Sequence, residues 1–169
     1  MNQKYKYISF RKKDISEDKF IPVINQEFFC KPKGGLWGSP YTPDGEYLSE
    51  WHRFTIEEFK SAFSENAVLF NLKETARIYT IDSMQDLIRF TNKYSLEPTV
   101  DIPIKHGFLK CWDFERASED YDVIYLTAKG EAETRLPPSN LPSFYGWDVE
   151  SILVLNFDAI ADWKYMRVE

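Results

Sequence analysis

The stretch AVLFNLKETARIYTI at residues 67–81 decides the fold class. Its two ends, 67–72 and 76–81, are rich in apolar, β-branched and aromatic residues, a composition typical of β-strands. The two predicted strands follow each other directly, without an intervening helix. Because regular alternation of strand and helix is absent, the pattern disfavours a doubly wound parallel sheet and favours an α+β fold with a mixed or antiparallel central sheet.

Segments on both sides of this stretch supply the rest of the predicted sheet and its helices. Further strands are predicted at 4–10 (KYKYISF), 122–127 (DVIYLT) and 151–156 (SILVLN), and weaker strand candidates lie at 20–24, 36–39 and 163–168. Helices are predicted at 56–64, after the capping-box residue Thr55, at 84–94, after Ser83, and at 113–119. Residues 97–110 and 131–146 contain prolines and are predicted loops. We expect a single domain, residues 1–169, with six or seven strands and two or three short helices.

Composition narrows the class of protein. Aromatic residues make up 17% of the 169-residue chain and hydrophobic residues 43%, which excludes a disordered chain. No apolar run approaches the roughly 20 residues of a membrane span, and the N-terminus lacks the apolar core of a secretory signal. The two cysteines, Cys30 and Cys111, cannot form a disulfide framework and lack partners at zinc-ligand spacing. We therefore expect a cytoplasmic protein without a metal.

Charge is spread unevenly along the chain. The formal net charge is −6, which argues against a large nucleic-acid footprint. Residues 1–33 nevertheless carry a balance of +4, and residues 34–169 a balance of −10. The basic segment has two interpretations, a solvated face or a surface that meets the phosphates of a ligand.

Signatures of several enzyme classes are missing. The chain has no GxGxxG, GxxxxGK[ST], HExxH or GxSxG motif. His52 and His106 are the only imidazoles, and the sequence places neither of them in a catalytic triad. We therefore expect both histidines to be structural or surface residues.

The stretch KPKGGLWGSP at residues 31–40 is the first candidate site. Three glycines within five residues allow a ligand or another backbone segment to approach closely. Trp37 offers a flat face for a ring, Ser39 offers a hydroxyl, and the flanking lysines suit an anionic ligand. The alternative interpretation is a tight surface turn whose Trp belongs to the core.

The sequence WDVES at residues 147–151 is the second candidate site, and it leads directly into the most apolar predicted strand. Asp148 and Glu150 are two positions apart on a predicted extended segment, so we expect both carboxylates on one face. Two like charges beside a buried strand are costly unless they bind something. A carboxylate there can grip ribose hydroxyls and offset the positive charge of an oxocarbenium-like state in glycosyl transfer. A solvated turn before the strand is the alternative.

Three motifs in this order resemble the mono-ADP-ribosyltransferase superfold, and most of all its small, divergent bacterial and phage members. They are the N-terminal strand segment Tyr7–Phe10, which contains Ser9, the Gly-rich segment 34–39, and the acidic pair of Asp148 and Glu150. The resemblance covers roughly residues 5–157. It implies an ADP-ribosyltransferase-like fold with NAD as the co-substrate and no metal.

The resemblance also implies roles for particular residues. The side chains or amides that would contact NAD are those of Ser9, Arg11, Gly34, Gly35, Trp37 and Ser39, with Trp37 stacked on a ring and the two glycine amides near the phosphates. Glu150 would bind the ribose and stabilise the oxocarbenium, and Asp148 would orient the acceptor or act as a weak base. The predicted loop 131–146, which contains Arg135, would flank the macromolecular acceptor.

Two alternatives are compatible with the same sequence. The chain can be an acidic interaction protein without catalysis, such as an immunity or antitoxin-like partner of a basic toxin or nuclease. Asp148 and Glu150 would then belong to a broad acidic patch, and Trp37 and Trp147 would be core or interface anchors. The other alternative is a nucleotide-binding relative of the transferase fold that has lost catalysis. In each case the negative charge favours a protein over a nucleic acid as the macromolecular partner.

Overall fold

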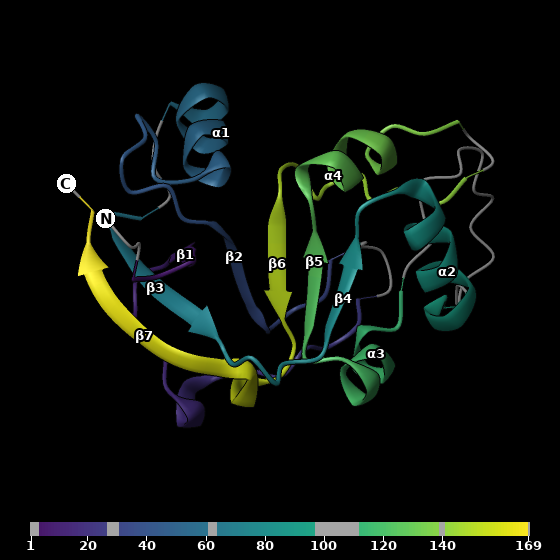
Figure 1. Ribbon diagram of the computed structural model, residues 1–169, viewed down its shortest axis with the longest axis horizontal. Coiled ribbons are helices and arrows are strands. Elements are labelled where there is room, and N and C mark those ends of the chain that lie inside the picture. The colour runs from purple at the N-terminus through teal and green to yellow at the C-terminus, as the bar shows by residue number, and fades with distance from the viewer. Residues whose placement is uncertain (1–3, 27–30, 61–63, 97–111, 139–140, 169) are drawn as a thin grey trace.

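A mixed β-sheet with helices packed around it forms the molecule (Figure 1). The computed structural model describes residues 4–26, 31–60, 64–96, 112–138 and 141–168. In this part of the chain seven strands are ordered β4-β5-β6-β2-β1-β3-β7, and four α-helices accompany them. The β4–β5 pair is parallel and the other pairs are antiparallel. The predicted α+β class with a mixed sheet is therefore confirmed.

The strands are β1 (Tyr7–Phe10), β2 (Leu36–Pro40), β3 (Asn66–Leu72), β4 (Ile78–Ile81), β5 (Val123–Leu126), β6 (Ser151–Val154) and β7 (Ile160–Arg167). The helices are α1 (Glu50–Phe59), α2 (Met84–Tyr94), α3 (Phe114–Asp120) and α4 (Ala128–Thr134), with short 3-10 turns at Glu17–Lys19 and Phe157–Ala159. Within the described ranges, no helix is both long and apolar enough to cross a membrane.

The two strands that follow each other in sequence, β3 and β4, do not pair. β3 lies between β1 and β7, whereas β4 forms the opposite edge of the sheet beside β5. The short connection between them crosses along one end of the sheet (Figure 1). The two strands are therefore adjacent in sequence but belong to opposite halves of the sheet, and the segment between them crosses from one half to the other.

Helix α2 matches its prediction at both ends. The Ser83 side chain accepts a hydrogen bond from the amide of Asp86, as an N-cap does. Leu87, Phe90 and Tyr94 are buried against the sheet, at the three- and four-residue spacing of one helix face. Strong amphipathic spacing and a matching cap therefore defined this element from sequence alone.

Helix α1 begins six residues before its predicted start. The Ser49 hydroxyl accepts a hydrogen bond from the amide of His52, so Ser49 is the N-cap. The predicted capping-box residue, Thr55, lies inside the helix, where its hydroxyl donates to the carbonyl of His52. The helix ends at Phe59, before Lys60 with its left-handed φ of 56°. The prediction was wrong because two capping sequences follow each other and the earlier one is used.

The predicted exposed loop at 131–146 is wrong at its start, where residues up to Thr134 are helical, and at Phe144, which is buried. Helix α4 occupies its first part, capped by the Thr127 side chain, which accepts from the amide of Gly130. Gly130 is buried, and an added Cβ there would clash with the backbone of Ile81, so glycine is required for α4 to pack this closely. Phe144 is fully buried and stacks on Trp147 at a centroid distance of 4.6 Å.

Three smaller expectations have different outcomes. The predicted strand at 20–24 reduces to an isolated bridge between Ile24 and Lys33. The predicted C-terminal strand is confirmed as the edge strand β7, which is longer than expected. The predicted loop at 97–110 lies outside the described residues, together with His106 and both cysteines.

Candidate functional site

Strand β2 changes its pairing partner part-way along, and this change opens the sheet. Residues Leu36–Gly38 of β2 pair with β6, whereas Ser39 and Pro40 pair with β1. The Ser39 hydroxyl donates to the carbonyl of Glu150 at 2.9 Å, so it links the two halves at the point where they part. Figure 1 shows β2 and β6 diverging toward the end that carries α1 and α4. A pocket lies at this divergence.

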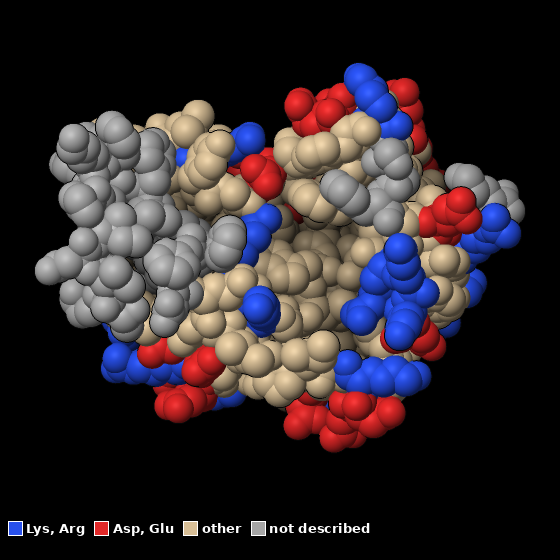
Figure 2. Space-filling view, turned by 180° about the vertical axis from the view of Figure 1, so that it is seen from behind, with Lys and Arg blue, Asp and Glu red and all other residues tan. Residues whose placement is uncertain are grey.

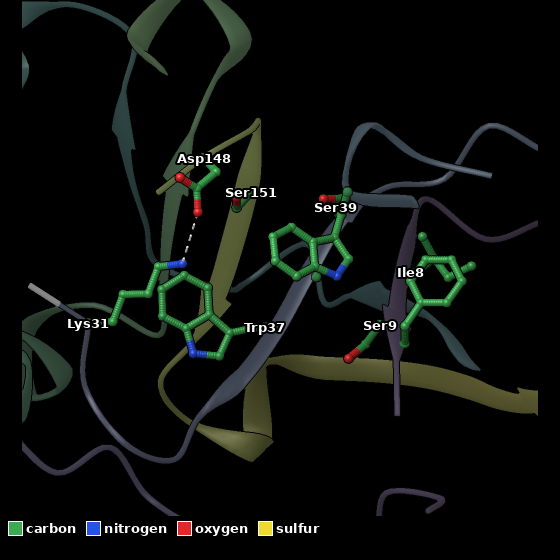
Figure 3. Close-up of a pocket in the computed structure, with 10 residues that line it drawn as sticks. Ile8, Ser9, Lys31, Trp37, Ser39, Asp148 and Ser151 are labelled. Atoms are coloured by element: carbon green, nitrogen blue, oxygen red, sulfur yellow. Dashed lines mark ion pairs between the residues drawn. The ribbon is translucent and has the colours of Figure 1, made fainter. Parts of the chain in front are cut away.

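The pocket has a volume of about 260 Å³ and takes its lining from both halves of the sheet and from α1. The lining residues are Ile8, Ser9, Phe10, Lys31, Trp37, Gly38, Ser39, Trp51, Asp148 and Ser151 (Figure 3). Seen from behind, the molecule is hollowed near its centre, with Lys and Arg side chains on part of the rim (Figure 2). The lining combines two indoles, three hydroxyls, one ammonium and one carboxylate, a mixture suited to a polar ligand with a ring.

The ammonium of Lys31 lies beside the one carboxylate and the two indoles of this pocket. Its Nζ lies 3.8 Å from a carboxylate oxygen of Asp148 and 5.3 Å and 6.0 Å from the ring centroids of Trp37 and Trp51 (Figure 3). Burial lowers the pKa of Lys31, and the nearby Asp148 carboxylate opposes this effect. The lysine is therefore held by two π-faces and one loose ion pair.

Trp37 joins the pocket to the core. Its ring meets the edge of Trp147 at a centroid distance of 4.6 Å, while Trp37 itself is only partly buried. Trp147 is fully buried, so of the two it is Trp147 that belongs to the core alone. Trp51 comes from the first turn of α1 and stacks on Phe54 at 5.6 Å. The two indoles are thus positioned by independent parts of the fold.

Four of the eight predicted site residues line this one pocket. They come from three distant segments of the sequence and are Ser9, Trp37, Ser39 and Asp148. Ser9 and Ser39 are both buried, at 6% and 2% exposure. The fold therefore brings together at least one member of each motif on which the resemblance depends.

Glu150 does not line this pocket, and its carboxylate is bonded to a side chain from β5. The Tyr125 hydroxyl donates a hydrogen bond to it, and Tyr125 packs with the core on the face opposite Trp37. Burial and the nearby Glu150 carboxylate raise the pKa of Tyr125 and of Tyr7. Of the two predicted carboxylates, only Asp148 lines the pocket, and the chain bends at 149–150 before β6 begins.

A larger groove adjoins the pocket, with a volume of about 600 Å³. Its lining comes from α1, α4 and the entrance to β6: Glu50, Arg53, Phe54, Glu57, Glu58, Ala128, Glu131, Arg135, Tyr145, Asp148, Val149 and Glu150. We call it the acidic groove, since six carboxylates face two guanidinium groups in this lining. Arg53 is bonded to Glu50 and Glu57, and Arg135 lies 3.5 Å from both Glu131 and Asp148. Asp148 thus lines both the pocket and the groove.

Gly34, Gly35 and Arg11 lie apart from this pocket. They border a separate cavity of about 60 Å³, together with Lys19. Both glycines have left-handed φ angles, 73° and 65°, and the Gly35 amide donates to the carbonyl of Ile21 at 2.8 Å. These glycines therefore allow close packing against the preceding segment, and the Gly35 amide is already bonded.

Sequence reasoning missed three contributors to the site. The sequence pattern indicates Lys31 only as a flanking charge, and Trp51 lies before the predicted start of its helix. Tyr125 lies in a correctly predicted strand, but nothing in its neighbourhood in the sequence indicates that it binds Glu150. The signal available for Lys31 was its place beside the Gly-rich segment, before the only nearby Trp.

His52 has a structural role. Its Nδ1 accepts a hydrogen bond from the amide of Leu48 at 3.2 Å, and its ring packs on Phe10 at 5.1 Å. Burial lowers the pKa of His52. Among the described residues, no group of three or more His, Cys, Asp or Glu side chains is arranged to hold a metal ion.

Comparison with known proteins gives no relative for this chain. No family model matches it, and no curated protein or solved structure is significantly similar to it. Evidence for a function therefore comes from the sequence motifs, the pocket and the acidic groove.

Proposed function

We propose that the chain is an NAD-dependent mono-ADP-ribosyltransferase and that NAD enters the pocket between Trp37 and Asp148. The observation that carries the proposal is the convergence of Ser9, Trp37, Ser39 and Asp148 on one pocket. These residues belong to the three motifs on which the resemblance depends, and the motifs lie far apart in the sequence. The order of the motifs does not by itself require them to meet.

The pocket supplies the groups that this chemistry needs. Transfer breaks the bond between the nicotinamide nitrogen and the ribose C1′, and the bond electrons leave with nicotinamide as a neutral molecule. The ribosyl carbon becomes oxocarbenium-like until an acceptor nucleophile attacks it and releases a proton. A carboxylate facing that carbon stabilises the developing positive charge, and an indole stacks on the departing ring.

Two carboxylates are candidates for this electrostatic role. Asp148 faces the pocket directly and is paired with Lys31. The backbone carbonyl of Glu150 accepts from the pocket residue Ser39, but the Glu150 carboxylate is bonded to Tyr125. For Glu150 to reach a ligand in the pocket, the bond to Tyr125 has to break. The present arrangement therefore favours Asp148 as the carboxylate nearest the ligand.

The acidic groove is the proposed acceptor side. It adjoins the pocket at Asp148 and contains Arg135, from the segment 131–146 that the resemblance places beside the acceptor. Six carboxylates in its lining would repel nucleic-acid phosphates and attract a basic protein surface. We therefore propose a protein acceptor with basic side chains near the modified group.

Incubation with NAD labelled in its adenylate part tests the function. Nicotinamide release and label on acceptor proteins from a cell extract are measured for the wild type, Asp148→Asn and Glu150→Gln. The essential carboxylate is the one whose variant loses about 100-fold or more in nicotinamide release. Glu65→Gln serves as control, because Glu65 is exposed and pairs only with Arg167 at 3.3 Å among the described ion pairs. Absence of both NAD binding and nicotinamide release in the folded wild type refutes the proposal.

The acidic groove also favours a second candidate, an interaction protein without catalysis. Its six carboxylates, from α1, α4 and the segment before β6, line one groove and outnumber the two guanidinium groups there. A basic protein that binds the chain in the absence of NAD, with affinity reduced by Glu57→Gln and Glu58→Gln, supports this candidate. Salt dependence of the association rate would be its kinetic sign.

A further inference from the structure

The surroundings of Lys31 form a cage for a positive charge. Two indoles and one carboxylate surround its ammonium at the distances given above, which are the elements of cation–π recognition. We propose that this cage is a binding site for an organic cation, and that Lys31 occupies it in the free protein as a displaceable internal ligand. The cage lies in the pocket proposed above for NAD, and the group that enters it would carry a positive charge.

Lys31 is a loosely held occupant. Its ion pair with Asp148, at 3.8 Å, is longer than a charge-assisted hydrogen bond of about 2.8 Å. Its side chain is still 37% exposed, and burial of the remainder lowers its pKa. The backbone is fixed separately, since the Lys31 carbonyl accepts from the Gln26 side chain at 2.7 Å. The ammonium can therefore leave on its flexible stem while the backbone stays in place.

The cage itself is anchored without Lys31. Trp37 packs on the buried Trp147, and Trp51 stacks on Phe54 within α1. Asp148 has a second cationic neighbour in Arg135, at 3.5 Å. Departure of the lysine would therefore leave two indole faces and a positioned carboxylate. Three hydroxyls, from Ser9, Ser39 and Ser151, border the same 260 Å³. Those of Ser39 and Ser151 donate to backbone carbonyls and can accept a hydrogen bond from a polar substituent of a ring.

The ligand must compete with the Lys31 ammonium for the cage, and this requirement indicates its chemical class. A lysine ammonium is compact and strongly hydrated, whereas a flat cation with delocalised charge is weakly hydrated and can stack on an indole. A pyridinium ring combines both properties, and the nicotinamide ring of NAD is a pyridinium. An anionic ligand would instead keep Lys31 in place and pair with it. The two possibilities therefore predict opposite effects of removing the lysine.

Calorimetric titration of the full chain measures this difference. The probes are 1-methylnicotinamide, which is a cation, nicotinamide, which is neutral, and nicotinate, which is an anion. We expect the wild type to prefer the cation, and Lys31→Met to bind it about tenfold more tightly because an internal competitor has been removed. Weaker cation binding by Lys31→Met, or equal binding of the cation and the neutral probe by that variant, overturns the proposal.

Matched variants identify the cage. Trp51→Leu should lose most cation binding without disturbing the core, since Trp51 is on the outer helix α1. Asp148→Asn should weaken binding of the cationic probe more than binding of the neutral probe. Trp163→Leu on the edge strand β7 is the control and should bind as the wild type does. If the cage binds 1-methylnicotinamide as expected and NAD is not consumed, only the proposed function fails. If NAD is consumed without any preference for the cation, only the cage proposal fails.

Discussion

Asp122 links three strands in the half of the sheet that supports the acidic groove. We predict that its contribution to the unfolding free energy depends on pH. Its carboxylate accepts from the backbone amide and the guanidinium of Arg77, at 2.8 to 3.1 Å, and from the Asn156 side chain at 3.0 Å. These bonds join the start of β4, the start of β5 and the end of β6. Arg77 and Asn156 hold the pKa of Asp122 at about 2.

The size of the effect follows from that pKa. A fall from 3.8 to about 2 corresponds to about 2.4 kcal/mol at 1.36 kcal/mol per pKa unit. Arg77 is half exposed, so solvent screening reduces this to about 1–2 kcal/mol. Because the pKa is depressed on folding, the contribution is complete above pH 3.8 and is lost as pH falls through about 2.

Urea denaturation of the wild type and Asp122→Asn, repeated from pH 7 down to pH 3, measures this contribution. The variant should lose about 1–2 kcal/mol of unfolding free energy at pH 7 and about half as much at pH 3. Asp158→Asn, an exposed carboxylate in the turn before β7, should change stability by less than about 0.5 kcal/mol. A loss that is equal at both pH values, or absent at pH 7, would refute the reasoning.

Three further variants test the site and its supports. Tyr125→Phe frees the Glu150 carboxylate and should raise nicotinamide release if Glu150 acts in the pocket; a fall matching that of Glu150→Gln would instead make Tyr125 a positioning residue. Gly130→Ala should lower the urea midpoint by an amount equivalent to about 1–3 kcal/mol, because the new Cβ meets the Ile81 backbone; an unchanged midpoint would contradict the close packing of α4. Ser49→Ala removes the α1 cap and should cost about 1 kcal/mol, measured by thermal denaturation, with no loss contradicting the cap.

Local patterns predicted the sheet well. The apolar runs that became β3, β5 and β6 were visible because each is a buried strand bounded by polar residues. The helix α2 was visible because cap and periodicity agree. Helix α4 was hidden because the prolines at 137–142 predict a loop from residue 131 onward. The missing Cβ of Gly130 allows the helix to lie on Ile81.

The site was predictable in part for a related reason. Trp37, Ser39 and Asp148 could be selected by residue type and by order along the chain, and they meet in the pocket. The direction of the Glu150 side chain depends on a bend at 149–150 and on Tyr125 from another strand, neither of which a local pattern encodes. The insertion of Lys31 between two indoles depends equally on tertiary packing.

The change of partner along β2 has a mechanical consequence. One strand of five residues serves as the seam between two half-sheets, and the pocket opens directly beside that seam. A molecule filling the pocket touches β1 and α1 on one side and the entrance to β6 on the other. Its binding would therefore stabilise the contact between the two half-sheets. At a concentration 100 times its dissociation constant, such a ligand adds about 2.7 kcal/mol to the unfolding free energy. By reciprocity, substitutions that loosen either half-sheet would weaken ligand binding without contacting the ligand.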